Sequence, residues 1–165
     1  MSRATARIAA MQLIFERLAG GQGGDDSLRM VYDELQAEGR LKGGDDTPSV
    51  ADRAWIETVL AGVLSHQEEL DRRIGEVSRG WTVERMPRVD LTILRLAAWE
   101  LLYEQDVPGP AVINEAVELA RCYSEPDSSR FINGVLGTIL RAHEDAQAKE
   151  ADHTEASAAD GGETE

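Results

Sequence analysis

Residues 124–140, "SEPDSSRFINGVLGTIL", place two hydroxyls, a guanidinium and an aromatic ring at the predicted start of a helix. These side chains belong to Ser128, Ser129, Arg130 and Phe131. Free backbone amides at a helix N-terminus bind anions, and a phenyl ring can stack on a base. Contact with a nucleic acid is therefore one interpretation of the segment. The other is an ordinary capped helix with Phe131 at the border of its apolar face.

The helix that carries these side chains is predicted by spacing. Its apolar residues recur at i, i+3, i+4, i+7 and i+8, as Ile132, Val135, Leu136, Ile139 and Leu140. Ser124 and Asp127, with Pro126 between them, resemble a capping box with proline in the first turn. On this helix Arg130 points roughly opposite to Ile132, so we expect its guanidinium at the surface.

No other group of residues has the spacing of a catalytic or metal site. The stretch "GGQGG", residues 20–24, lacks the Gly-Lys-Ser/Thr ending of a phosphate-binding loop and follows a predicted helix. The three histidines are scattered, and Cys122 has no histidine near it in sequence. Glu115 and Glu118 share one helix face, which is typical of a solvated surface. We predict that the protein is not an enzyme and holds no metal or cofactor.

Composition favours a helical domain in a reducing compartment. The 165 residues are 42% hydrophobic but only 5% aromatic, which suits helices and suffices for one buried core. No apolar run has the length of a membrane span, and the N-terminus is too polar for a secretory signal. The single Cys122 can form no internal disulfide. We expect a cytoplasmic protein without a membrane partner.

The formal net charge of −14 is unevenly distributed. Residues 142–165 hold eight acidic groups and one lysine, so they carry −7, and residues 1–141 carry the other −7. Because that C-terminal segment contains almost nothing apolar larger than alanine, we predict that it is a disordered acidic tail. The body remains acidic, so any nucleic-acid site must be local.

The rest of the chain has helical periodicity and no alternating strand pattern. Helices are predicted over residues 4–18 and 25–39. Thr47 and Pro48 are predicted to start the next helical segment, residues 49–78, which is one helix or two with a bend near residues 65–67. The most apolar segment, residues 86–105, is predicted to be the buried central helix, and residues 111–123 form a further helix before the segment discussed first. The predicted fold class is all-α.

Three segments together resemble the NusB family of transcription antitermination factors over residues 1–141. They are "ARIAAMQLIFE", "WTVERMPRVDLTILRLAAWELLYEQDVPGPAVINEAVELA" and "DSSRFINGVLGTIL". The second is the most specific, since Trp81, Glu84-Arg85, the following helix, Val107-Pro108 and "INEAVELA" keep one order and spacing. The resemblance implies a seven-helix bundle of two packed subbundles, here residues 1–141, followed by the acidic tail, residues 142–165.

The resemblance also implies a function and the residues that perform it. The family binds boxA-type single-stranded RNA and, with ribosomal protein NusE, joins the RNA polymerase antitermination complex that reads through ribosomal RNA operons. The implied RNA-binding residues are Arg3, Arg7, Asp127, Ser128, Ser129, Arg130 and Phe131. The implied NusE-binding residues are Phe15, Asp90, Arg95, Glu100 and Glu115, although Arg95 and Glu100 could instead form an ion pair within the bundle.

Two other functions compete with this one. The N-terminal segment "SRATAR" holds only two arginines, fewer than many family members have, so a protein adaptor or homodimer with a weakened RNA face is the main alternative. A helical domain of this type also precedes the catalytic domain of some RNA cytosine methyltransferases. That enzyme needs an α/β cofactor-binding domain after the helices, where this chain has the acidic segment.

Overall fold

The computed structural model describes residues 2–21, 29–30, 33–34, 37, 49–104 and 106–160, and within them every regular element is helical. Six α-helices have defined bounds in this part of the chain: α1 (Arg3–Leu18), α3 (Val50–Ser65), α4 (Gln67–Val77), α5 (Arg88–Tyr103), α6 (Gly109–Tyr123) and α7 (Ser128–Asp160). A short 3-10 turn, η1 (Val83–Arg85), connects α4 to α5. The all-α prediction is confirmed, whereas the count of seven is not.

The predicted boundaries of α1, α3, α5 and α6 lie within two residues of those in the structure. The predicted helix over residues 25–39 falls largely outside the described residues, as do Thr47 and Pro48. Ser49 caps α3 in a capping box with Asp52, in place of the predicted start at Thr47. The bend expected near residues 65–67 is confirmed, because His66 ends α3 and starts α4.

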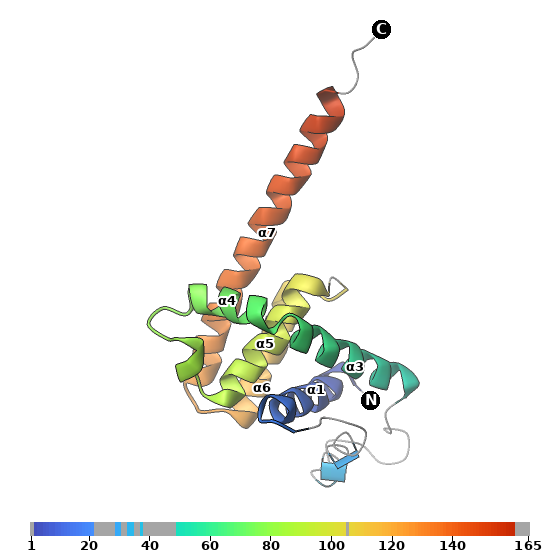
Figure 1. The fold of residues 1–165 in the computed structure, drawn as a ribbon, viewed down its shortest axis with the longest axis vertical. Helices are drawn as coiled ribbons and strands as arrows, with labels where there is room; N and C mark the ends of the chain where they lie inside the picture. The colour runs from blue at the N-terminus through green and yellow to red at the C-terminus, as the bar shows by residue number, and fades with distance from the viewer. Residues whose placement is uncertain are drawn as a thin grey trace.

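α5 is the central helix, as predicted. It packs against α1, α3, α4, α6 and α7, and Figure 1 shows it in the middle of the bundle. Eleven of its 16 residues are buried, including the large side chains of Ile93, Leu96 and Trp99. α3 approaches closely at Gly62, where an added Cβ would overlap the indole ring of Trp99. The glycine therefore fixes the distance between α3 and α5.

The C-terminal segment differs from its prediction. Residues 142–160 are not disordered but continue α7, which leaves the bundle as a single projecting helix (Figure 1). Almost all of their side chains are exposed. Alanine and glutamate are strong helix formers. Because the first turns of α7 are packed in the bundle and already helical, these residues only have to extend a helix and do not have to nucleate one. The segment can thus remain helical without burying anything; residues 161–165 lie outside the described part.

Candidate nucleic-acid interface

The start of α7 is held against α5 by a buried carboxylate. The hydroxyl of Ser128 donates to Asp90 Oδ2 over 2.8 Å, and the hydroxyl of Ser124 donates to Asp90 Oδ1. Ser124 is the C-cap residue of α6, and its hydroxyl binds Asp90. The predicted capping box of Ser124 with Asp127 is therefore wrong. Ser128 and Asp90 are both buried, so they position the helix and face no solvent.

A tight turn brings an aromatic side chain onto the start of α7. The amide of Trp81 donates to the carbonyl of Ser78 over 3.0 Å, and Gly80 has a φ of +77°. A positive φ at the third position of such a turn is typical of type II and favours glycine. The turn reverses the chain after α4, and the Trp81 and Phe131 rings meet with centroids 6.3 Å apart.

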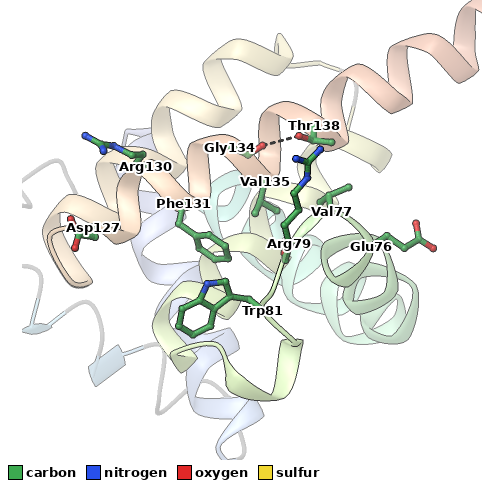
Figure 2. A pocket seen from close by; sticks show the side chains of 11 residues that line it. Glu76, Val77, Arg79, Trp81, Asp127, Arg130, Phe131, Gly134, Val135 and Thr138 are labelled. Carbon is green, nitrogen blue, oxygen red and sulfur yellow. Dashed lines mark hydrogen bonds between the residues drawn. The ribbon is translucent and has the colours of Figure 1, made fainter.

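These two rings form one end of a groove between the α4–η1 turn and α7. Its volume is about 580 Å³, and its lining includes Arg79, Trp81, Asp127, Arg130 and Phe131 (Figure 2). Arg79 and Arg130 are exposed and have no ion-pair partner among the described residues. Exposed cations beside an exposed indole match the phosphates and bases of a single-stranded nucleic acid.

The second predicted arginine of the RNA site, Arg7, lies inside the bundle. Its Nε donates to Glu100 Oε1 and Oε2 over 2.9 and 3.2 Å, and the two residues are 4% and 2% exposed. Burial raises the pKa of Glu100 above its ordinary value of 4.5, and the hydrogen bond and charge of Arg7 offset only part of that effect. Because Arg7 is buried and paired, its guanidinium cannot contact a phosphate. Glu100 is buried as well, so it cannot contact a partner protein.

Arg3 lies above another aromatic ring. Its guanidinium carbon is 4.4 Å from the ring centroid of Trp55 on α3, within the range of a cation–π interaction. The indole nitrogen of Trp55 donates to Glu104 Oε1 over 2.8 Å. The Arg3 side chain is exposed, so it keeps a charged surface near the C-terminal end of α5.

The predicted RNA-binding residues therefore fall into two places. Asp127, Arg130 and Phe131 line the groove, while Arg7 contacts the other end of α5. The two ends are marked by Asp90 and Glu100, ten residues apart, which corresponds to about 15 Å along a helix. Ser129 is half-buried in the first turn of α7.

The predicted partner-binding residues are also separated. Phe15 is 37% exposed and lies between two hollows, of about 240 and 290 Å³. Arg95 lines the larger hollow, but it is buried and pairs with Asp71 over 2.7 Å. Arg95 and Glu100 each form an ion pair within the bundle, as the alternative interpretation held. Arg95 pairs with Asp71, and Glu100 pairs with Arg7. Glu115 is half-buried on α6.

Sequence reasoning did not assign Arg79 and Trp81 to the site. In the sequence, Trp81 stands out only as part of the family pattern. The sequence feature that could have indicated them is the run Arg79-Gly80-Trp81 in a polar connection between two helices. A tryptophan in such a connection does not belong to the apolar face of either helix. The groove itself depends on α4 and α7 lying side by side, which spacing along the chain does not show.

Two further features bear on the kind of protein. Among the described residues no cluster of three histidine, cysteine or acidic side chains is placed to hold a metal ion. Within the same residues no helix combines the length and the apolar character that crossing a membrane requires.

The fold and the groove define a class, namely a small all-helical protein with exposed aromatic and cationic side chains at one helix start. A family model described as the NusB family matches residues 4–141, and the chain belongs to this family. It is similar to a protein of Symbiobacterium thermophilum named transcription antitermination protein NusB. The two are 39% identical over 141 residues, which cover 86% of this chain and 90% of that protein.

Solved structures give the same fold. NusB of T. maritima matches with a TM-score of 0.70 and 27% identity over 87% of this chain and 93% of that one. A crystal structure described as antitermination factors NusB and NusE in complex with double-stranded RNA matches with a TM-score of 0.68 and 24% identity. That match covers 85% of this chain and 96% of the other, and it supports the fold alone.

Proposed function

We propose that this protein is an RNA-binding transcription antitermination factor that acts in the cytoplasm. It binds boxA-type single-stranded RNA together with ribosomal protein NusE, and it promotes read-through of ribosomal RNA operons as part of the RNA polymerase antitermination complex. The observation that carries the proposal is the groove at the start of α7, where two arginines with no ion-pair partner among the described residues flank an aromatic pair in a chain of the NusB family. The names of its relatives agree with this function.

In the proposed site, Arg130 contacts a phosphate, and Ser129 and the backbone amides at the helix start contact sugar or phosphate oxygens. Asp127 lies at the rim, where its carboxylate repels phosphate and limits affinity. Arg3 extends the charged surface at the far end of α5. Because Arg7 is buried, few phosphates are neutralised, so we expect weak binding without NusE and a shallow dependence on salt.

NusE binding is proposed to centre on Phe15. Its exposed ring separates two hollows, and Arg88 and Glu84 line the larger one. An aromatic anchor with charged residues around it is a common arrangement at protein interfaces. The buried residues Asp90, Arg95 and Glu100 support the helices behind this surface.

The proposal can be tested with a short fluorescein-labelled boxA-type RNA, by anisotropy titrations with and without NusE at several salt concentrations. Arg130→Ala should weaken binding and reduce the salt slope by about 0.7, the value for one phosphate contact on a single strand. Arg53→Ala, which removes an exposed arginine from α3, is the matched control. Since one structural neighbour is described with double-stranded RNA, the duplex form of the same RNA should be titrated in parallel.

The second candidate, a protein adaptor or homodimer without RNA binding, is favoured by the burial of Arg7, which leaves a thin set of surface arginines. It predicts that the chain binds NusE or a second copy of itself and binds RNA neither alone nor with NusE. Phe15→Ala tests whether the NusE surface at Phe15 and the RNA groove at the start of α7 act independently. For an RNA-binding factor, it should weaken NusE binding and leave RNA binding without NusE unchanged.

A further inference from the structure

We infer that Trp81, rather than Phe131, is the side chain on which an RNA base stacks, and that the groove leads from this base site to a phosphate site at Arg79. The inference deepens the proposed function and rests on it. Trp81 is 51% exposed at the turn between α4 and η1, whereas Phe131 is half-buried against the core. An indole also has a larger face than a phenyl ring to offer to a base.

The geometry of the two rings excludes a base between them. Their centroids are 6.3 Å apart and their planes are tilted by 56°, which is an aromatic pair already in contact. A base inserted between two rings needs them parallel and further apart. Phe131 is therefore assigned as a support that fixes the orientation of Trp81, and, because Trp81 is 51% exposed, the base is placed on the indole face turned away from Phe131.

The groove has a cationic end opposite the aromatic one. Figure 2 shows Arg79 rising from the turn toward Thr138 on α7, while Trp81 and Phe131 lie together at the other end. Arg141 extends the charge along α7, since its Nη2 donates to the hydroxyl of Thr138 over 3.3 Å. A nucleotide with its base on Trp81 can direct its phosphate toward these guanidinium groups, so the charges are complementary to one segment of RNA backbone.

Gly134 leaves this groove open. It lies between Arg130 and Thr138 on the same face of α7, and a Cβ built on it meets no atom within 4 Å. Glycine in a helix interior costs stability relative to residues with side chains, so the position is not favourable for the helix itself. A side chain there would extend into the space that a nucleotide needs.

The first test compares aromatic variants in titrations with the labelled boxA-type RNA in the presence of NusE. A stacked base contributes affinity that corresponds to a factor of about 5 to 150. We expect Trp81→Leu to weaken binding by at least about fivefold, and Phe131→Leu to weaken it less. Tyr103→Leu is the matched control, because Tyr103 is similarly exposed at the end of α5 but far along that helix from Asp90.

The second test does not depend on a destabilising change. Gly134→Gln should raise the melting temperature and still weaken RNA binding by at least about tenfold, because the new side chain fills the groove while improving the helix. Ala146→Gln, which adds the same side chain at an exposed position of α7 beyond the groove lining, should leave RNA affinity unchanged. A loss of binding in a more stable variant cannot be a result of unfolding.

Tryptophan fluorescence gives a direct measurement. Unlabelled RNA should quench the emission of the parent protein, and Trp81→Leu, which retains Trp55 and Trp99, should lose most of that quenching. The inference is overturned if Trp81→Leu and Gly134→Gln bind RNA as tightly as the parent while Arg130→Ala binds more weakly. In that case the proposed function survives. If the parent binds no RNA with or without NusE, the proposed function and the inference both fail.

Discussion

Replacing the buried Arg7 by methionine tests whether this arginine stabilises the bundle or binds RNA. Arg7→Met retains much of the side chain's apolar volume and removes its charge from Glu100. The carboxylate of Glu100 would then be ionised in the core without a counter-charge, which costs more than binding a proton. We therefore expect Glu100 to become protonated in the folded variant.

The magnitude follows from that protonation. At pH 7, protonating a carboxyl whose ordinary pKa is 4.5 costs about 3.4 kcal/mol, at 1.36 kcal/mol per pH unit, and this is the upper limit of the electrostatic loss. We expect the free energy of unfolding to fall by about 3 kcal/mol, which corresponds to a melting temperature about 6 to 12 °C lower. At pH 5.5 the same limit is only about 1.4 kcal/mol.

The parent protein has a pH dependence of its own at this residue. Because burial raises the pKa of Glu100, the folded state binds a proton more tightly than the unfolded chain does. The contribution of Glu100 to stability therefore increases as the pH falls from neutral toward 4.5, and it levels off below that value. A Glu100→Gln variant should lack this component of the pH dependence.

Urea denaturation at pH 7 and pH 5.5 measures these differences. Arg72→Met is the matched control, because Arg72 also pairs with a glutamate, Glu76, but in an exposed i,i+4 pair, and its loss should cost less than about 0.5 kcal/mol. Adding Glu100→Leu to Arg7→Met should recover most of the loss, since a buried ion pair can be replaced by apolar residues at little cost.

Two results would refute this reasoning. A loss below about 1 kcal/mol at pH 7, or one that does not shrink at pH 5.5, would mean that the ion pair is not buried as described. An Arg7→Met variant that keeps its stability but loses RNA affinity and salt dependence, as Arg130→Ala should, would return Arg7 to the RNA site.

Three further changes test the core and the projecting helix. Trp99→Ala should lower the free energy of unfolding by about 3 to 5 kcal/mol in urea denaturation, because it removes a large buried ring. Arg130→Ala, the surface control, should change it by less than about 0.5 kcal/mol, and equal losses would contradict the assignment of Trp99 to the core. Gly62→Ala should cost about 1 to 3 kcal/mol through overlap with Trp99, and a gain in stability, usual for this change in an open helix, would show that α3 and α5 are further apart. Deleting residues 142–165 should lower the helical circular dichroism signal and leave the free energy of unfolding within about 0.5 kcal/mol, and a larger loss would show that this helix packs on the body.

The sequence by itself determined the class of the fold and most of its local structure. The periodicity of apolar residues located α1, α5, α6 and the bend at His66, because a helix must keep one face toward the core and that requirement is local in the chain. The same pattern marked α5 as central, since its apolar residues nearly encircle it. The composition of residues 142–160 did not predict their helix, because low hydrophobicity favours disorder, whereas alanine and glutamate can prolong a helix that has already started.

Only the tertiary structure decided which charged and aromatic side chains reach the surface. Sequence spacing cannot show that Arg7 meets Glu100, 93 residues away, or that Asp90 accepts hydrogen bonds from Ser124 and Ser128. An arginine or aspartate has the same appearance in a sequence whether it binds a ligand or a partner inside the core. Trp81 gained its proposed role in the same way, because the turn at Gly80 folds it against Phe131 on a helix 50 residues further along the chain.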